Sequence, residues 1–417
     1  MIAEQIRADE EGTVAASSAQ AAHVVCICGG YGYPLGNASA ARITTVGKAL
    51  KRSGMNFSLL HCGPSPDSVN TKRSGVYQGI PFEYTASVKR PKNLPARLLV
   101  YTRALIGLTL RLARLRPLRH RTLVYLYVGD GILNFYTGLL CRLLGFRLVQ
   151  ELCEWAPGDS NCSAFTRWLY RKPIFKLATG ALVISKAIED RVKERSAEVN
   201  PGLLILRLPS IVDAKRFATS SADDGVQTAN HFVYCGTWLK DVFFIVRAFA
   251  MVRSQGYDCK LRIVGGWTES RKSAILKYAV ENNLSADDIV MTGCVDERGL
   301  EACYRTAAAL LTPLWDDDRS KTRLPNKLGE YLASGRPVVA GKVGDLTEFL
   351  IDDVNACLAE PGDERDFADR MVSVLRDPTR AHQIGAAGQQ ASLTHLDYRA
   401  HSSRLSKFFV ECLEHSR

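Results

Sequence analysis

Short apolar runs of strand length recur along the chain, and each is followed by a stretch with helical spacing. In the first half these runs are HVVCIC, NFSLLHC, TLVYLYV, FRLVQEL and GALVIS. Strands that are apolar on both faces are typical of a parallel sheet that is covered by helices on both sides. This alternation predicts an α/β fold built from doubly wound sheets.

The alternation stops once and then starts again, which predicts two domains. After LLILRLPSIV the chain enters a polar stretch at residues 218–230, and the runs resume with HFVYCG, CKLRIVGG, DIVMTG, AALLTPL and RPVVAG. A length of 417 residues also suits two or three domains. We expect a flexible arm at residues 1–20, Rossmann-like domains at residues 21–210 and 211–397, and a C-terminal helix at residues 398–417.

Composition and charge narrow the class of protein further. Apolar residues make up 46% of the chain and charged residues 23%, which excludes a largely disordered protein. The twelve cysteines form no CxxC pair, and no stretch is typical of a signal peptide or a membrane span. We therefore expect a cytoplasmic protein with reduced thiols and no metal site. The net charge of +11 indicates an anionic partner, namely nucleic acid, an anionic membrane or a phosphorylated substrate.

Ligands of doubly wound sheets bind beyond the carboxyl ends of the strands. This chain gathers its glycines and charges at those predicted ends, in residues 29–36, 236–241, 265–266, 293 and 315–327. We expect the two rims to face one another across an interdomain cleft.

The segment at residues 313–350 carries the most informative pattern. Its predicted helix begins near Pro325 and places Leu328 and Leu332 towards the core. Lys327 and Glu330 lie on the opposite arc. The helix N-terminus and the lysine suit a diphosphate, and the glutamate suits two ribose hydroxyls. An ordinary amphipathic helix with a solvated polar face has the same spacing.

At this point the residues resemble a known family. LPNKLGEYLASGRPVVA, followed by GDLTEFL, resembles the donor-site signature of family-4 retaining glycosyltransferases, which have the two-domain GT-B fold. Four more regions resemble the family in the same order: LRLPSIVDAKRF, YCGTWLKD with AFAMV, LRIVGG with MTGCV, and the C-terminal helix that crosses back to the first domain. The resemblance implies transfer of a sugar, with retention, from a nucleotide diphosphate sugar to a hydroxyl of a saccharide or lipid-linked acceptor. It implies neither a metal nor a further cofactor.

The resemblance also implies roles for individual residues. Glu330 is expected to bind the donor ribose, while Lys240 and Lys327 neutralise the diphosphate and act in catalysis together with Glu154. The other expected donor-binding residues are Gly36, Asn37, Gly236, Thr237, Gly265, Gly293, Cys294, Val295, Arg323, Leu324 and Asn326.

Two positions depart from the family pattern. Thr237 stands where the family often has an arginine, and Thr322 stands where it often has a glutamate. Lys321, Arg323 and Lys327 are close enough in sequence to supply the missing positive charge. These departures concern the geometry of the donor site rather than the class of protein.

Acidic residues lie at two other predicted strand ends. LVQELCEWAP places Glu151 and Glu154 where a family member contacts the sugar, although a polar rim residue fits equally well. The run at residues 316–318 is interpreted as a solvated loop, because a GT-B enzyme neutralises the diphosphate with basic residues and a helix end. The loop GYGYPLGNASAAR lacks the GxGxxG spacing of a dinucleotide site.

A basic amphipathic stretch at residues 95–116 is the clearest charge pattern elsewhere. Arg97, Arg103, Arg111 and Arg114 occupy about one third of the helical wheel, and apolar residues cover the rest. This pattern suits an anionic membrane surface, or a helix that covers the sheet and turns its arginines to water. No motif or aromatic-interleaved basic surface favours nucleic acid.

A glycosyltransferase is therefore the predicted function, with three alternatives. A nucleotide-sugar epimerase of the same fold would share the donor site, and a noncatalytic nucleotide-sugar or membrane-binding protein would bind without turnover. A Rossmann oxidoreductase is disfavoured by the failed glycine motif.

Overall fold

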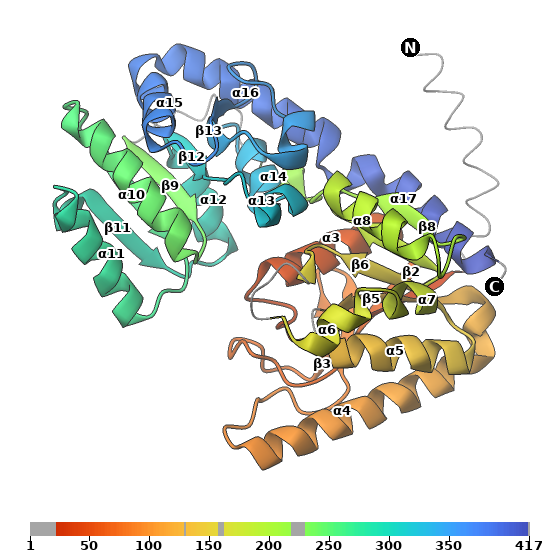
Figure 1. Ribbon diagram of the computed structural model, residues 1–417. Coiled ribbons are helices and arrows are strands. Elements are labelled where there is room, and N and C mark those ends of the chain that lie inside the picture. Colours follow the sequence, from red (N-terminus) through yellow and green to blue (C-terminus); the bar gives the residue numbers. More distant parts are fainter. Residues whose placement is uncertain (1–21, 129–130, 157–161, 218–229, 416–417) are drawn as a thin grey trace, which may run out of the picture. The chain divides into compact units, whose positions relative to one another are not determined.

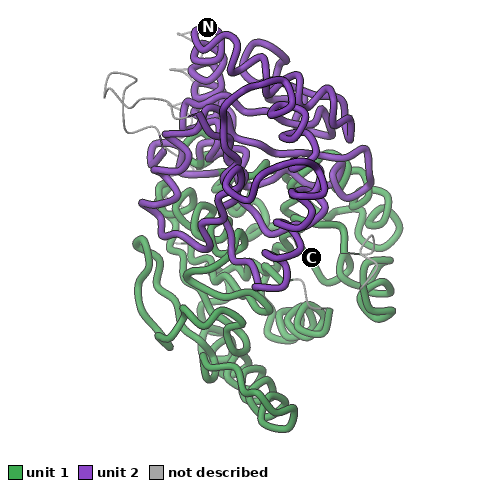
Figure 2. The backbone as a smooth tube through the Cα atoms, turned by 90° about the vertical axis from the view of Figure 1, so that its left-hand side faces the viewer, with its two compact units in different colours: residues 1–211, 398–417 green, residues 212–397 purple. Residues whose placement is uncertain are grey.

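The computed structural model describes residues 22–128, 131–156, 162–217 and 230–415, which form two compact α/β units. Unit 1 comprises residues 1–211 and 398–417, and unit 2 comprises residues 212–397 (Figures 1 and 2). The expected arm at residues 1–20 and most of the polar stretch at residues 218–230 lie outside the described residues.

Unit 1 is built on an eight-stranded sheet with the order β3-β4-β2-β1-β5-β6-β7-β8. All neighbouring strands are parallel except β3 and β4, which form an antiparallel pair that the apolar runs did not predict. The strands are β1 (His23–Gly29), β2 (Asn56–His61), β3 (Ser74–Tyr77), β4 (Ile80–Tyr84), β5 (Thr122–Val128), β6 (Arg147–Leu152), β7 (Gly180–Val183) and β8 (Leu204–Arg207). The apolar runs of the first half all form strands, as predicted.

Helices cover both faces of this sheet because successive side chains of a strand point to opposite sides. Val24 and Cys26 of β1 pack in a core with α3 and α17, whereas Val25 and Ile27 pack with α4 and α5. The helices of the unit are α3 (Ala38–Arg52), α4 (Leu94–Leu115), the 3-10 helix η1 (Arg116–Arg121), α5 (Gly131–Leu144), α6 (Ala164–Leu169), α7 (Pro173–Leu177), α8 (Lys186–Ser196) and α17 (Tyr398–Glu414). The C-terminal helix α17 thus belongs to the unit that holds the N-terminal half.

Unit 2 has a six-stranded, wholly parallel sheet with the order β11-β10-β9-β12-β13-β14. Its strands are β9 (His231–Cys235), β10 (Lys260–Val264), β11 (Ile289–Gly293), β12 (Ala309–Thr312), β13 (Val338–Gly341) and β14 (Cys357–Ala359). Its helices are α9 (Ala214–Phe217), α10 (Leu239–Ser254), α11 (Glu269–Glu281), η3 (Ala286–Asp288), α12 (Glu297–Thr306), α13 (Asp318–Thr322), α14 (Asn326–Ala333), η4 (Gly344–Glu348), α15 (Glu364–Arg376) and α16 (Pro378–His395). Because every strand is parallel, all their carboxyl ends lie along one edge.

The fold is GT-B, with two Rossmann-like units of parallel sheet. Within the described residues, no helix is both long enough and apolar enough to cross a membrane.

Candidate functional site

The carboxyl ends of β9, β10 and β11 form an edge of exposed backbone. Gly236 donates its N–H to the carbonyl of Val264 at 2.9 Å, and Gly265 donates to the carbonyl of Gly293 at 3.0 Å. A Cβ atom at Gly265 would lie 2.6 Å from the carbonyl oxygen of Gly236, and Gly293 has a φ of +73°. Glycine is required here because a side chain would push the strand ends apart or strain the backbone. The result is a close-packed edge that a flat ligand can approach.

Lys327 lies directly over this edge, on the first turn of α14. Its ammonium donates a hydrogen bond to the carbonyl of Cys235 at 3.2 Å and lies 4.0 Å from the ring centroid of Tyr234. Burial lowers the pKa of Lys327 to about 8. The negative charge of Asp241 opposes this shift, and the positive charge of Arg323 adds to it. The site therefore holds a partly desolvated cation that gains stabilisation from any bound anion.

The helix that carries Lys327 is anchored through its apolar face. Leu328 and Leu332 are buried, as their spacing predicted. The hydroxyl of Tyr331 accepts a hydrogen bond from the N–H of Cys235 at 2.7 Å, which ties α14 to the end of β9. Pro325 at the N-cap has no side-chain oxygen to cap the first turn. The positive end of the helix dipole is thus presented beside the lysine.

Glu330 lies one turn beyond Lys327 and is held by groups from another helix. Its carboxylate accepts a 3.4 Å hydrogen bond from the hydroxyl of Tyr304, and the charge of Arg216 acts on it. Burial nevertheless raises its pKa to about 7. A carboxylate desolvated to this degree gains from hydrogen-bond donors such as vicinal hydroxyls.

Two arginines lie near the ring of Trp238, which follows Gly236 and Thr237. Arg319 is near the start of α13, and Arg323 directly follows its end. The guanidinium of Arg319 lies 3.6 Å from the Trp238 ring centroid, and that of Arg323 lies 5.7 Å away. The Nε of Arg323 is buried without a hydrogen-bond partner. Arg323 also acts electrostatically on both Lys327 and Tyr234. The structure thus groups Arg323 with Lys327.

Lys240 has a different environment from the one we expected. Its ammonium pairs with the carboxylate of Asp317 at 3.3 Å and lies 3.8 Å from the ring centroid of Trp315. Asp317 lies in the loop before α13 with its side chain 42% exposed, and this side chain also caps α13 by accepting the N–H of Ser320. Asp316 pairs with Lys321, so that lysine is engaged as well.

The two departures from the family pattern have different structural settings. Thr237 is exposed at the start of the loop after β9. Thr322 is buried, and its hydroxyl donates to the carbonyls of Asp318 and Arg319 within its own helix. Thr322 therefore serves the helix and offers no charge to a ligand.

The remaining expected residues of unit 2 lie along the same edge. Cys294 is exposed and Val295 half-buried just beyond β11, and Asn326 is half-buried at the start of α14. Leu324 is buried, so its contribution to a ligand site is limited to its main chain.

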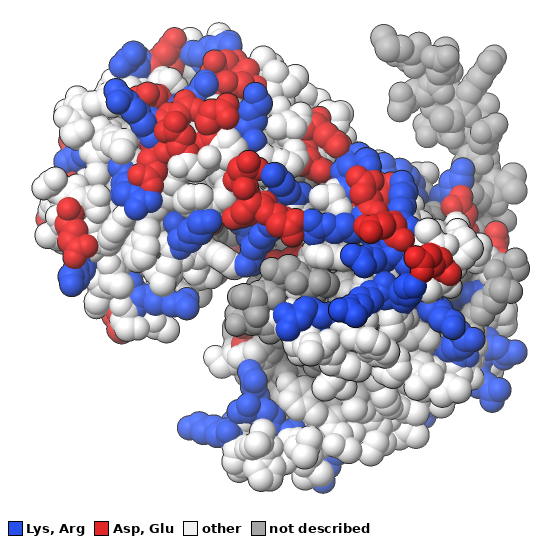
Figure 3. Space-filling view, in the orientation of Figure 1, with Lys and Arg blue, Asp and Glu red and all other residues white. Residues whose placement is uncertain are grey.

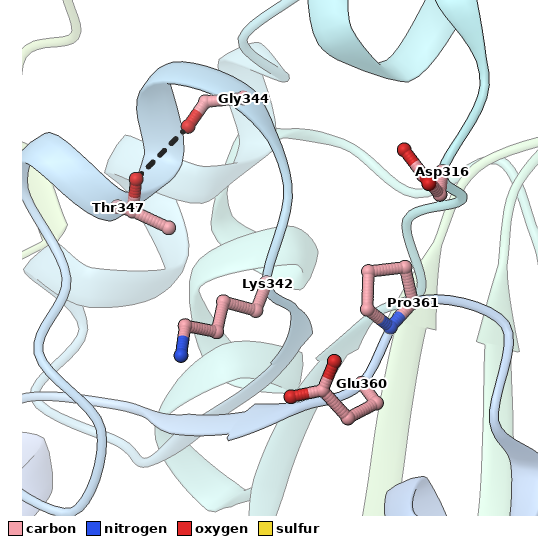
Figure 4. Close-up of a pocket in the computed structure, with 6 residues that line it drawn as sticks. All are labelled: Asp316, Lys342, Gly344, Thr347, Glu360 and Pro361. Carbon is pink, nitrogen blue, oxygen red and sulfur yellow. Dashed lines mark hydrogen bonds between the residues drawn. The ribbon is translucent and has the colours of Figure 1, made fainter.

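A separate pocket of about 570 Å³ opens beyond β13 and β14 (Figure 4). Its lining residues are Asp316, Lys342, Gly344, Thr347, Glu360 and Pro361. In Figure 4 the Lys342 ammonium and the Glu360 carboxylate lie on the same side of the pocket, and Thr347 donates to the carbonyl of Gly344 at 3.1 Å. Two carboxylates and one ammonium suit hydroxyl groups better than phosphate. The walls of this pocket come from three separate loops, so no single sequence motif predicted it.

The glycine-rich loop of unit 1 holds its own side chains tightly. The Asn37 amide caps α3 by accepting the N–H of Ala40 at 2.9 Å, and it donates to the carbonyl of Gly32 and the carboxylate of Asp67. Gly36 has a φ of +105° and packs against Asp67. Both N–H donors of the Asn37 amide are thus used within the unit. A ligand at this loop would therefore contact chiefly the main chain.

Glu151 lies within β6 and Glu154 just after it, and of the two only Glu154 is exposed. Glu151 is buried and accepts hydrogen bonds from Arg42 at 3.0 Å and from the hydroxyl of Tyr125. Arg42 also donates to the carbonyl of Leu208 at 3.1 Å. The expectation that Glu151 lies on a ligand-facing rim is wrong, because this carboxylate neutralises a buried arginine.

A metal site is not evident in the described part of the chain, where no three His, Cys, Asp or Glu side chains cluster closely enough to hold an ion.

Comparison with known proteins finds similarity to glycosyltransferases. Residues 229–377, which contain the whole unit 2 site, match the model of a family described as glycosyl transferases group 1. The D-inositol 3-phosphate glycosyltransferase of Kribbella flavida is 28% identical over 45% of this chain and 45% of its own length. A GDP-mannose-dependent phosphatidylinositol monomannoside mannosyltransferase of Mycolicibacterium smegmatis is 26% identical over 50% of this chain and 56% of its own. The matches thus span about half the length of these curated relatives.

Solved structures share the fold over nearly the whole chain. Sucrose-phosphate synthase from Thermosynechococcus elongatus superposes with a TM-score of 0.70 at 15% identity, covering 93% of this chain and 98% of that protein. The HepE protein of Anabaena, in complex with UDP and glucose, superposes with a TM-score of 0.68 at 13% identity, covering 94% and 99%.

Proposed function

We propose that this protein is a retaining glycosyltransferase of family 4 that moves a sugar from a nucleotide diphosphate sugar to a hydroxyl group. The observation that carries the proposal is the position of Lys327 over the end of β9, with Glu330 one turn away and the glycine-rich edge beside both. A desolvated cation, a helix N-terminus and a carboxylate match the diphosphate and ribose of such a donor. The family match to residues 229–377 supports the same reading.

In this proposal the protein acts mainly on the leaving group. Negative charge grows on the diphosphate as the bond to the sugar breaks, and Lys327 with the N-terminus of α14 lowers the energy of that charge. Arg323 adds a second cation, while Lys240 is partly neutralised by Asp317. The reaction as proposed uses neither a metal ion nor a cofactor besides the donor.

The remaining donor contacts follow from the same edge. Main-chain groups of Gly236, Gly265 and Gly293 hold the nucleotide, with Cys294 and Val295 beside the base. In unit 1, Glu154 and the main chain at Gly36 and Asn37 are the proposed contacts to the transferred sugar and the acceptor.

The acceptor in this proposal is a saccharide or a lipid-linked saccharide. One of the relatives is named for a phosphatidylinositol monomannoside acceptor, which is lipid-linked, and the HepE structure holds UDP and glucose. These names support a sugar-bearing acceptor and a nucleotide donor for the present chain.

A surface of unit 1 supports peripheral attachment to an anionic membrane on the cytoplasmic side. On α4, Leu98, Ile106 and Leu110 are exposed by 68%, 54% and 51%, and Arg103 and Arg114 are exposed on the same helix. Between Thr85 and Gln150 the sequence has twelve lysines and arginines and one acid, Asp130. Figure 3 shows a mostly uncharged surface around α4 and α5, with basic atoms along its border and little acid. Apolar side chains beside cations suit a bilayer with anionic headgroups.

Only some of the four arginines of α4 are available for the proposed membrane surface. Arg111 makes an ion pair with Glu83, to which it donates from Nε and Nη2, and Arg97 is half-buried. The membrane-facing charge therefore comes from Arg103 and Arg114 rather than from all four arginines of the helix.

A donor screen tests the proposed activity. The full-length protein is incubated with a panel of UDP-, GDP- and other nucleotide sugars, with and without a membrane extract, and release of the nucleoside diphosphate is measured. Release that requires the extract, with label incorporated into saccharide or lipid, supports the transferase. Release without any acceptor points to an epimerase, and binding without release points to a noncatalytic protein. An NMR spectrum of the product's anomeric centre tests retention.

A further inference from the structure

A second cavity lies in unit 1, at the edge of its sheet opposite to the carboxyl strand ends near which Gly36, Asn37 and Glu154 lie. It has a volume of about 470 Å³ and is lined by His23, Lys51, Asn56, Phe57, Ser58, Pro81, Leu118, Arg121 and Thr122. His23, Asn56 and Thr122 begin three neighbouring strands and are paired in register, so the cavity lies at the amino ends of β2, β1 and β5. Ligands of the main site lie beyond the carboxyl ends instead.

The lining is cationic and rich in hydrogen-bond donors. Lys51 and Arg121 are exposed at its mouth, and no carboxylate is among the lining residues that the structure describes. The ammonium of Lys51 donates to the carbonyl of Gly79 at 2.6 Å, which leaves its charge unneutralised. Burial lowers the pKa of His23, so the positive charge comes from the other two residues. Asn56, Ser58 and Thr122 add an amide and two hydroxyls.

One of these hydroxyls has no partner within the chain. Thr122 is fully buried, and its Oγ1 has no hydrogen-bond partner among the described residues. A buried hydroxyl without a hydrogen-bond partner destabilises the folded state, and such groups are uncommon in folded proteins. Ser58, by comparison, is satisfied by the ring of His23 at 2.9 Å. Because Thr122 is one of the residues that line the cavity, a ligand oxygen that reaches this hydroxyl would supply the missing hydrogen bond.

We infer that this cavity binds a phosphate ester, with the phosphate between Lys51 and Arg121 and a ligand oxygen reaching Thr122. The apolar walls formed by Phe57, Pro81 and Leu118 suit the carbon-bearing part of the ester. A free phosphorylated metabolite and the headgroup of an anionic lipid both carry this chemistry. The second source is accessible because Leu118 and Arg121 belong to η1, which directly follows the exposed helix α4.

The soluble arm of the test measures inorganic phosphate and glycerol 3-phosphate binding to the full-length protein by isothermal titration calorimetry. All titrations use a Lys327→Ala background, which removes the phosphate cation of the proposed donor site, and a sodium chloride blank of equal ionic strength. We expect binding that Arg121→Ala weakens at least tenfold. Arg116→Ala, the same charge change in the same 3-10 helix but outside the cavity, is expected to leave the affinity within twofold.

The lipid arm compares vesicles of phosphatidic acid with vesicles of phosphatidylglycerol, which have a similar surface charge but lack a terminal phosphate monoester. Preferential sedimentation with phosphatidic acid that disappears in Arg121→Ala assigns the cavity to lipid headgroups. Soluble binding without this preference assigns it to a free phosphate ester. Thr122→Val, which keeps the side-chain shape, is expected to weaken whichever ligand binds while leaving the melting temperature unchanged or higher.

Two results overturn the inference. One is the absence of phosphate binding in both arms. The other is an equal loss of affinity in Arg116→Ala and Arg121→Ala, which would show that phosphate binds through nonspecific electrostatic attraction rather than in the cavity.

Discussion

Lys327 and Glu330 lie one turn apart on α14, and burial brings the pKa of each towards neutrality from opposite directions. The pKa of the lysine falls to about 8, and that of the glutamate rises to about 7. Each group is therefore held in surroundings that penalise its charged form. In the proposed donor complex, a phosphate beside the lysine and hydroxyl groups beside the glutamate would restore both charges, which would link donor binding to proton binding.

Donor binding should depend on pH through Lys327. In the free protein this lysine loses its proton as the pH rises through about 8, so we expect the affinity for the nucleoside diphosphate to fall between about pH 7 and pH 9. Lys327→Arg keeps the charge over this range and is expected to remove most of the pH dependence. Calorimetric titration of both proteins across this range provides the measurement. The same fall in both would show that another group controls binding.

Glu330 is predicted to strengthen ligand binding and to lower the free energy of unfolding. The folded protein holds a proton on this carboxyl up to about pH 7, whereas the unfolded chain releases it near its ordinary pKa. The folded state thus binds more protons between these values, so stability falls as the pH rises from about 4.5 to 7. At pH 8, Glu330→Gln should raise the free energy of unfolding by up to about 3 kcal/mol.

The same Glu330→Gln variant should lose donor affinity by roughly tenfold to a hundredfold, equivalent to about 1.5–3 kcal/mol for a charged hydrogen bond. Urea denaturation and calorimetry measure the two effects separately. Glu297→Gln is the control, because Glu297 also pairs with Arg216 but is half exposed. Lower stability with unchanged donor affinity would assign Glu330 a purely structural role.

Arg323 is predicted to matter more for the diphosphate than Lys240. Arg323→Ala removes a guanidinium whose buried Nε has no hydrogen-bond partner, and we expect donor affinity to fall at least tenfold. Lys240→Ala removes an exposed cation that Asp317 already neutralises in part, and we expect a change of less than about threefold. Inhibition by the nucleoside diphosphate ranks the two variants. A larger effect at Lys240 would mean that its ion pair with Asp317 opens when the donor binds.

The buried pair of Arg42 and Glu151 is predicted to dominate the local stability of unit 1. Arg42→Met leaves Glu151 buried without its cation, and we expect a loss of about 3–5 kcal/mol. The half-exposed pair of Arg111 and Glu83 offers a control, since Arg111→Met should cost about 1 kcal/mol or less. Urea denaturation followed by near-ultraviolet circular dichroism compares them. Equal losses would show that burial does not distinguish the two pairs.

Membrane attachment is predicted to depend on the exposed face of α4. Replacing Leu98 and Ile106 with serine, or Arg103 and Arg114 with glutamine, should reduce sedimentation with anionic vesicles severalfold. The charge variant should be sensitive to salt because exposed charges are screened over about 8–10 Å. Arg111→Gln should have little effect, since its partner is Glu83. Equal sedimentation with neutral and anionic vesicles, or none with either, would leave α4 as a helix that only covers the sheet.

The fold and the main elements of the unit 2 site were predictable because their signals are local. Apolar runs such as HVVCIC and RPVVAG identify buried parallel strands from a few consecutive residues, and both form strands. The spacing of Leu328 and Leu332 orients α14 in the same way. The short strands β3 and β14 were not predicted, because three or four residues at the margin of a sheet are too few to show a hydrophobic pattern.

Sequence alone therefore determined the two sheet units and the helix that carries Lys327 and Glu330. Only the tertiary structure decided which of the other charged groups remain available. Lys240 forms an ion pair with Asp317, which lies 77 positions further along the chain. Arg42 forms one with Glu151, 109 positions further along. Arg111 meets Glu83 from the preceding strand. The physical reason is that the state of a charge depends on its neighbours in space, and a periodic pattern specifies only the face on which a residue lies.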